Sequence, residues 1–244
     1  MPDAPHPGAG HRARLRDKFL AHGLEKFTDA EILELLLTLA TPRQDCKERA
    51  RQLLAKFGGL AAVLEAPAPE LAREPGLGPK NVLGLKLVPA VARRYLEDRL
   101  AAGPGPLEPA SLLEWLTMSM QALSREVCRV ILLDAAGGVL AWEEIFAGTY
   151  NEAAVYPREV VALALSRGAA GLIFVHNHPS GDPTPSPDDR RLTRRLFHAC
   201  RGVGLDMADH YIIARGGAYS FAQAGELAGW RQETAALGLE DGAA

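Results

Sequence analysis

The spacing of apolar residues divides the chain into a first part with helical periodicity and a second part that mixes strand and helix patterns. Between residues 11 and 100, apolar side chains recur every three or four positions, which is the period of an amphipathic helix. One stripe that includes Ile32, Leu35, Leu36 and Leu39 follows Thr28–Glu31, whose composition is typical of a capped helix start. Residues 11–100 are therefore predicted to form an all-helical domain.

Residues 111–231 are predicted to form a second, α/β domain. Two short apolar segments, at 127–134 and 139–147, are joined by Ala-Ala-Gly-Gly and favour a strand hairpin. A helix that opens at Pro157 ends at Gly168, just before the β-branched, apolar run at 171–175, which is typical of a buried strand. Such an order predicts a mixed sheet with helices packed against it.

Segments rich in Pro, Gly and Ala delimit these two domains. Residues 1–10 contain too few large apolar side chains to pack and are predicted to be disordered. Residues 101–110 break every periodicity and are typical of a stiff interdomain linker. The tail at 232–244 is rich in Ala, Gly and acidic residues, and we expect it to fray.

Composition favours a soluble cytoplasmic protein. The three cysteines are odd in number and widely spaced, which fits a reducing compartment and no disulfide framework. We find no signal peptide and no apolar run of membrane length, so we expect no membrane contact. A homodimer is compatible with this composition.

The segment from His176 to Asp189 concentrates side chains that bind metals. His176 and His178 are two residues apart at a strand end, so both imidazoles project to the same side of an extended backbone. Asp189 is the third residue of a helix for which Ser186 is the predicted N-cap. Two imidazoles and one carboxylate suit zinc and leave the fourth tetrahedral position open. We therefore predict one catalytic Zn²⁺ per chain.

Each half of this pattern also has a purely structural explanation. Ser-x-x-Asp before an apolar run is an ordinary capping box, and a lone His-x-His at a strand end is more often incidental. Their coincidence within one segment favours the metal site, and Ser186 can cap the helix while Asp189 binds the metal. Two interpretations of His210 stay open, namely a satisfied structural histidine or hydrogen-bond support for the site.

The spacing His-x-His, seven residues, Ser-x-x-Asp resembles the motif of the JAMM (MPN/JAB) metalloproteases, which cleave peptide and isopeptide bonds. The fuller string HNHPSGDPTPS resembles the bacterial RadC family more closely still, together with Pro157-Arg158-Glu159 upstream and Asp209-His210 downstream. This resemblance covers most of the chain and implies a JAB/MPN-like fold and a peptide or protein substrate. It also implies zinc ligation by His176, His178 and Asp189, with Ser186 stabilising an oxyanion.

JAMM enzymes carry an upstream glutamate as general base, and two glutamates are candidates for that role here. Glu159 lies in the first turn of the helix before the 171–175 strand. Antiparallel packing of this helix against the strand would bring Glu159 near the zinc. Glu143, on the second hairpin strand, is the rival. An alternative for Glu159 is a purely structural one, in which it interacts with the helix dipole.

A second short motif, Pro75 to Lys80, resembles the turn of a helix-hairpin-helix. Gly76 and Gly78 permit a tight turn, and the backbone amides that follow can face a phosphate, with Lys80 and Lys86 adding charge. Residues 11–100 hold 16 Lys and Arg against 12 Asp and Glu, a net charge of +4, whereas the whole chain carries −3. Sequence-independent DNA binding and a plain helical corner both remain open.

Two function classes follow. The first is a zinc-dependent hydrolase in which water attacks an amide carbonyl and a glutamate accepts the proton. The alternative is a DNA-binding or nuclease-type repair protein, which the RadC family's "DNA repair" naming suggests, with a structural zinc and the hairpin as its functional part.

Overall fold

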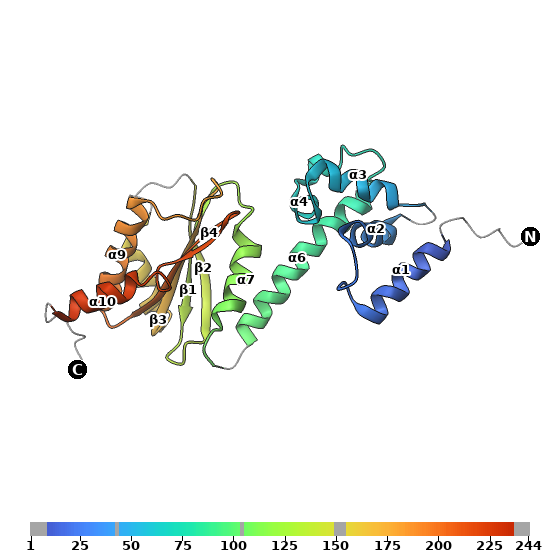
Figure 1. Cartoon of the computed structure of the whole chain (residues 1–244). Coiled ribbons are helices and arrows are strands. Elements are labelled where there is room, and N and C mark those ends of the chain that lie inside the picture. The colour runs from blue at the N-terminus through green and yellow to red at the C-terminus, as the bar shows by residue number, and fades with distance from the viewer. Residues whose placement is uncertain (1–8, 42–43, 103–104, 149–154, 237–244) are drawn as a thin grey trace, which may run out of the picture. The chain divides into compact units, whose positions relative to one another are not determined.

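The computed structural model describes residues 9–41, 44–102, 105–148 and 155–236 (Figure 1). The chain divides into two compact units, Met1–Ala92 and Arg93–Ala244. The first is helical and the second contains a mixed sheet packed by helices, which confirms the predicted fold class. Residues 1–8 of the segment predicted to be disordered lie outside the described residues, whereas residues 9–10 begin a helix, so the prediction is wrong at these two positions.

The first unit is a cluster of helices around a leucine-rich core. Its helices are α1 (Ala9–His22), α2 (Asp29–Ala40), α3 (Lys47–Phe57), α4 (Leu60–Glu65), α5 (Ala68–Leu71) and the first part of α6 (Pro79–Ala102). Its core includes Leu33, Leu37, Ala50, Leu53, Val63, Leu71 and Leu85.

Helix α2 begins as predicted but buries a different face. Thr28 and Glu31 form both reciprocal bonds of the capping box. Leu33 and Leu37 are the buried leucines, whereas Leu39 is 75% exposed. Of the predicted stripe, Leu36 packs against the core, whereas Leu39 does not. Leucine or isoleucine occupies most positions of this helix, so periodicity alone does not select the buried face.

The predicted linker at 101–110 is wrong at both ends, because its first two residues belong to α6 and its last two residues, Pro109 and Ala110, begin α7 (Pro109–Met120). Helix α6 continues through Ala101 and Ala102, and residues 103–104 lie outside the described ranges. Leu96 and Leu100 pack against the core of the second unit, so apolar burial holds the end of α6 in helical form. The division between the units therefore falls at Ala92, earlier than the predicted boundary at residue 100.

The second unit is built on a five-stranded sheet in the order β2-β1-β3-β4-β5. Only β3 and β4 pair in parallel, and the other three pairs are antiparallel. Its strands are β1 (Glu126–Leu133), β2 (Val139–Gly148), β3 (Gly171–Asn177), β4 (Asp206–Ala214) and β5 (Gly217–Ser220). Its further helices are α7 (Pro109–Met120), α8 (Pro157–Ser166), α9 (Pro187–Arg201) and α10 (Glu226–Ala236).

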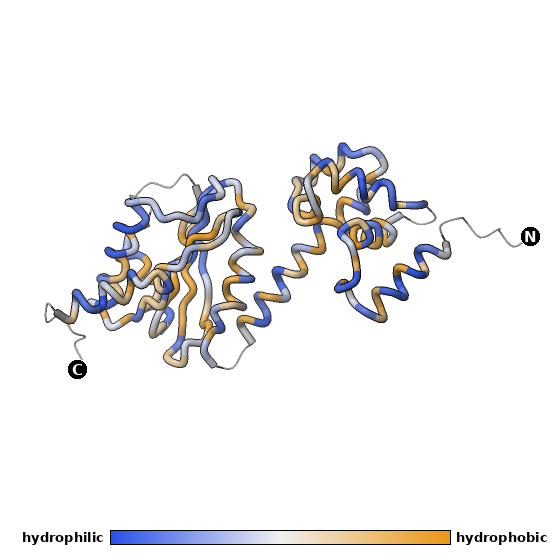
Figure 2. The backbone as a smooth tube through the Cα atoms, in the orientation of Figure 1, coloured by the Kyte–Doolittle hydropathy of each residue, from blue (hydrophilic) through white to orange (hydrophobic). Residues whose placement is uncertain are grey.

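Helices cover both faces of this sheet. Helices α8, α9 and α10 pack on the face that carries Cys128, Val130, Leu172 and Phe174, and α7 packs on the opposite face (Figure 1). Every residue of β3 is buried, as expected for a central strand covered on both sides. Figure 2 shows the central strands in predominantly hydrophobic colours.

The predicted fraying from Gln232 onward is wrong as far as Ala236. These residues form the end of α10, where Thr234 is buried and its hydroxyl donates to the Trp230 carbonyl. Residues 237–244 lie outside the described ranges. Among the helices that the structure describes, none is both long and apolar enough to span a membrane.

Candidate metal centre

The end of β3 presents two histidines on one side of the sheet. His176 lies in the strand, and His178 follows it, its backbone N–H donating to the Ile213 carbonyl at 2.9 Å. Asn177 points the other way, where its side-chain oxygen accepts from Val127 N–H at 2.8 Å and its amide donates to the Arg125 carbonyl at 3.1 Å. Asn177 thus anchors the strand end while its two neighbours face the site, as the two-residue period predicts.

The first turn of α9 brings a carboxylate to the same place. Ser186 is the N-cap, and its hydroxyl accepts from Asp189 N–H at 3.1 Å. The backbone N–H and the hydroxyl of Ser186 both donate to Asp189 Oδ2, at 2.7 and 2.6 Å. The capping box is confirmed, and it fixes the Asp189 side chain. The same bonds commit the Ser186 hydroxyl hydrogen to Asp189, so donation to an oxyanion requires that hydroxyl to rotate.

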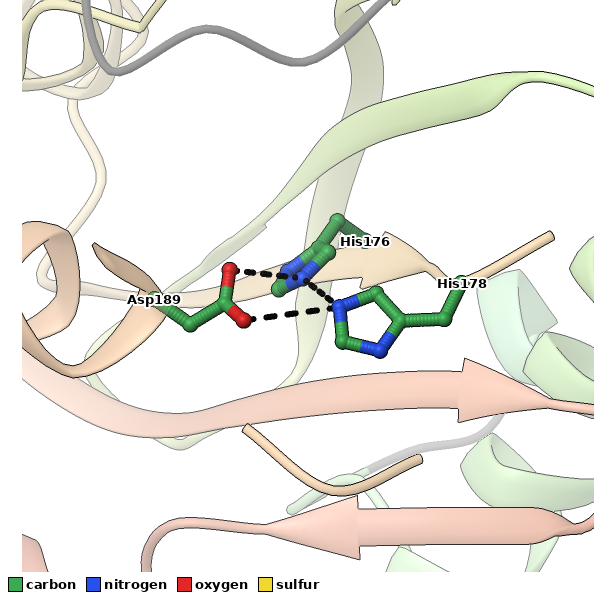
Figure 3. Close-up of side chains that lie close together, drawn as sticks. All are labelled: His176, His178 and Asp189. Atoms are coloured by element: carbon green, nitrogen blue, oxygen red, sulfur yellow. Dashed lines mark hydrogen bonds and ion pairs between the residues drawn. The ribbon is translucent and has the colours of Figure 1, made fainter. Parts of the chain in front are cut away.

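The three predicted ligands converge on one point (Figure 3). His176 Nε2 lies 3.0 Å from His178 Nε2 and 3.2 Å from Asp189 Oδ1, and His178 Nε2 lies 3.4 Å from Asp189 Oδ2. Ligands placed tetrahedrally at 2.0–2.1 Å from a zinc ion are separated by about 3.3 Å. The separation of the two imidazole nitrogens, and the distance from each to its nearer Asp189 oxygen, are close to this value, with a different carboxylate oxygen facing each histidine.

The hydrogen bonds of His178 show that this group of atoms is suited to a cation. His178 Nδ1 lies 2.8 Å from the Asp182 carbonyl oxygen, which can only accept, so Nδ1 carries the hydrogen. In the neutral ring, Nε2 of His178 then has a lone pair that faces His176 Nε2 and the Asp189 carboxylate. Acceptor atoms this close repel one another unless a proton or a metal ion lies between them.

Charge at the site shifts the pKa values of these groups in opposite directions. Burial alone would raise the pKa of Asp189, but hydrogen bonds with His176, His178 and Ser186 outweigh it and hold that pKa far below its usual range. Burial alone would lower the pKa of His178, but Asp189, the Asp182 backbone and the charge of Glu126 raise it overall. A carboxylate is thus present at neutral pH, as metal binding requires.

His210 both packs in the core and touches the site. Its ring is fully buried between Phe174 and Phe221, with both ring centroids at 4.8 Å, and is stacked on Phe221. Its Nε2 lies 2.8 Å from Nδ1 of His176. Burial, followed by the charge of His176, lowers the pKa of His210 well below its ordinary value. The structural and supporting interpretations of His210 therefore apply together.

Comparison with known proteins gives the family. Residues 107–226 match a family described as the RadC-like JAB domain, and residues 10–83 match a UPF0758 N-terminal domain. A UPF0758 protein of Idiomarina loihiensis is 40% identical over 214 residues, 88% of this chain and 96% of that protein. The chain belongs to the RadC-like UPF0758 family.

Further UPF0758 relatives show the same extent of similarity. One from Rhodobacter capsulatus is 43% identical over 87% of this chain and 100% of its own length. One from Methylibium petroleiphilum is 42% identical over 88% of this chain and 96% of its own length. The family resemblance seen in the sequence is thereby confirmed over both units of the chain.

The two predicted base candidates of the RadC-like domain have other contacts. Glu143 forms an ion pair with Arg167, the C-cap residue of α8, at the end of that helix from which the chain continues to the start of β3. Glu159 is in the first turn of α8, but its side chain is 65% exposed and its carboxylate is 4.0 Å from the Arg158 guanidinium. The contacts of Glu143 and Glu159 therefore do not support either residue as the general base at the metal site.

A third glutamate of the RadC-like domain, Glu126, is better placed. It is the first residue of β1, two positions before Cys128, whose Cα partner on β3 is His176. Continued two residues past the last pair, this antiparallel register would put Glu126 on the same face at the level of His178. Its charge contributes to the raised pKa of both His178 and Cys128, in agreement with this position. The two-residue spacing of Glu126, Cys128 and Val130 puts these residues on one face of the strand. Only the pairing of β1 with β3 shows that this is also the face of His176.

The hairpin of the UPF0758 N-terminal domain forms a turn with internal roles. Gly76 has a φ of 77°, a backbone conformation that favours glycine, and a Cβ there would displace the Arg49 guanidinium, which lies 2.3 Å from its position. Gly78 N–H donates to the Asn81 side chain at 3.2 Å. Lys86, a predicted phosphate contact, donates instead to the Leu64 and Ala66 carbonyls, whereas Lys80 is exposed. The helix before the turn, α5, is only four residues long.

Proposed function

We propose that the RadC-like domain is a zinc-dependent hydrolase that cleaves an amide bond in a peptide or protein substrate. The observation that carries this proposal is the convergence of His176, His178 and Asp189 at tetrahedral separations. Two imidazole nitrogens and one carboxylate oxygen form a ligand set that suits zinc. JAB membership agrees with this chemistry.

The burial of the ligands supports a catalytic site over a closed structural one. The side chains of His176 and Asp189 are 1% and 3% exposed, whereas that of His178 is 13% exposed, so the site opens to solvent on the His178 side. Three protein ligands and one open side are typical of catalytic zinc. When bound, zinc would lower the pKa of its water to about 7 and would polarise a substrate carbonyl.

The protein's own groups supply the remaining chemistry. Glu126, at the level of His178, would accept a proton from the attacking water and deliver it to the leaving amine nitrogen as the C–N bond breaks. The water oxygen ends on the acyl carbon, so the products are a carboxylate and an amine. Ser186 would stabilise the oxyanion only after its hydroxyl leaves Asp189. Glu126 thus replaces Glu159 and Glu143 as the proposed base.

A second proposed activity, DNA binding by residues 11–100, has weaker support. The hairpin turn exists and Lys80 is exposed at the start of α6, where helix amides can bind phosphate. Engagement of Lys86 with backbone carbonyls removes one of the two expected basic contacts. We therefore place the hydrolase first.

Metal analysis combined with glutamate variants tests the hydrolase. We expect about one zinc per chain in purified protein, and hydrolysis of at least one member of a panel of fluorogenic peptides and lysine-isopeptide conjugates. Glu126→Gln should keep the zinc and lower the rate by about 10²- to 10⁴-fold, the usual contribution of a general base. Glu143→Gln and Glu159→Gln are the matched controls and should retain the rate. Absence of zinc, or full activity in Glu126→Gln, would overturn the proposal.

A further inference from the structure

The two metal-facing histidines are oriented by different kinds of partner. His178 Nδ1 donates to a backbone carbonyl, which cannot donate, so the position of its hydrogen is fixed. His176 Nδ1 instead faces Nε2 of His210, and an imidazole nitrogen can either donate or accept. The tautomer of His176 therefore depends on what holds His210.

Thr193 holds the far side of the His210 ring. Its Oγ1 lies 2.7 Å from His210 Nδ1 and 2.5 Å from the backbone carbonyl oxygen of Asp189, one helical turn earlier in α9. Thr193, His210 and His176 are all buried, with 0% exposure. The three side chains form one hydrogen-bonded row that starts at the Asp189 carbonyl and ends at the metal position.

The carbonyl at the start of this row sets the direction of every hydrogen bond. Two oxygens separated by 2.5 Å repel unless a hydrogen lies between them, so the Thr193 hydroxyl donates to the Asp189 carbonyl. Its oxygen then accepts from His210 Nδ1–H. The neutral His210 ring is left with a lone pair on Nε2, which accepts from His176 Nδ1–H.

The last bond in the row determines whether the site can bind a cation. With its hydrogen on Nδ1, His176 directs the lone pair of Nε2 toward His178 and Asp189, at 3.0 and 3.2 Å. In the opposite tautomer an N–H would occupy that position and block a metal ion. We propose that Thr193 and His210 are positioning residues that hold His176 as the Nδ1–H tautomer and thereby prepare its Nε2 for the metal.

This inference deepens the proposed function and rests on it for the identity of the metal. Orienting partners of metal-bound histidines typically contribute about 10- to 100-fold in affinity. Asp189 serves the site twice, because its carboxylate is a ligand and its backbone carbonyl starts the row. The row also gives the buried polar groups of Thr193 and His210 hydrogen-bond partners within the core.

The first measurement uses metal-free wild-type protein and requires no variant. Imidazole ¹⁵N chemical shifts, recorded at a pH where the rings are neutral, distinguish the two tautomers of each histidine. We expect His176 and His210 both to carry the hydrogen on Nδ1. A hydrogen on Nε2 of either ring would overturn the inference. Because no metal is present, this result does not depend on whether the protein is a zinc hydrolase.

The second measurement compares variants by titration with zinc chloride against a chromophoric chelator. Thr193→Val removes the hydroxyl at nearly constant volume and should weaken zinc binding by about 10- to 100-fold. Thr193→Ser keeps the hydroxyl and should restore the affinity. Thr234→Val is the matched control, because Thr234 is also buried and also donates to a carbonyl four residues earlier, but lies outside the row of Thr193, His210 and His176. Equal zinc affinity in Thr193→Val and Thr193→Ser would contradict the proposal.

Discussion

Substitution of Asp189 by asparagine separates the two roles of its side chain. The carboxylate faces His176 and His178 through its two oxygens, at 3.2 and 3.4 Å, while Oδ2 also accepts two hydrogen bonds from Ser186. An asparagine of the same size has one acceptor oxygen, which can serve either Ser186 or the metal position. We expect the helix cap to keep that oxygen and the metal to lose its third ligand.

The magnitude follows from the number of ligands. Apparent zinc-binding free energies of about 10–16 kcal/mol for four-ligand structural sites correspond to about 3 kcal/mol per ligand. A loss of about 3 kcal/mol raises the zinc Kd roughly 100-fold. Loss or retention of a helix cap changes stability by only about 1 kcal/mol. Zinc affinity should therefore change far more than the stability of the metal-free fold.

Glu31→Gln is the control for this experiment. Glu31 occupies the same position in the capping box of α2, in the other unit, and Thr28 there corresponds to Ser186. We expect Glu31→Gln to bind zinc like the wild type, and both variants to keep their helical circular dichroism. Competition with a chromophoric chelator measures each Kd. An Asp189→Asn variant with wild-type zinc affinity would refute the assignment of Asp189 as a ligand.

Three further predictions concern pH, packing and DNA. Protons compete with zinc for His178, so zinc affinity should fall about tenfold per pH unit below its raised pKa. In the metal-free protein, His178 stabilises the fold below its ordinary pKa of 6.5 and this contribution is lost as pH rises through the raised value. Asp189 stabilises the fold above its ordinary pKa of 3.8, and this contribution is lost as pH falls through the lowered value. Both contributions are therefore complete between pH 3.8 and pH 6.5, where the melting temperature of the metal-free protein should be highest. Phe174→Ala, at a fully buried ring, should cost about 3–5 kcal/mol of unfolding free energy by urea titration, whereas Leu165→Ala, at a 51% exposed position, should cost under about 1 kcal/mol. DNA binding by the full chain should weaken steeply as salt rises, and should be weaker in Lys80→Ala than in the wild type. Binding that does not depend on salt, or no binding at low salt, would contradict the proposed DNA-binding activity.

The metal ligands could be predicted from sequence because short-range rules place them. The two-residue period of a strand puts His176 and His178 on one side, and helix capping puts Asp189 at a helix start. All three lie within one short segment, so little of the tertiary structure was needed. The two-unit division and the mixed sheet were predictable for the same reason, since each element carried its own local pattern.

The general-base candidate depended on long-range pairing that the sequence does not reveal. Glu126 becomes a candidate only because β1 pairs antiparallel with β3 in the register that joins Cys128 to His176. Glu159 satisfied the helix geometry, but its side chain turned to solvent. Likewise, Lys86 had the charge to bind phosphate, but the carbonyls of Leu64 and Ala66 that hold it come from a separate segment. Position along an element was predictable, whereas side-chain partners from segments far apart in the sequence were not.

Anomalous diffraction at the zinc absorption edge, from crystals grown with zinc, tests the central claim most directly. We predict one strong peak per chain, about 2.0–2.2 Å from His176 Nε2, His178 Nε2 and an Asp189 carboxylate oxygen, with its remaining side open toward Glu126. No peak at this position, or a peak held by other residues while these three stay hydrogen-bonded to one another, would contradict the account.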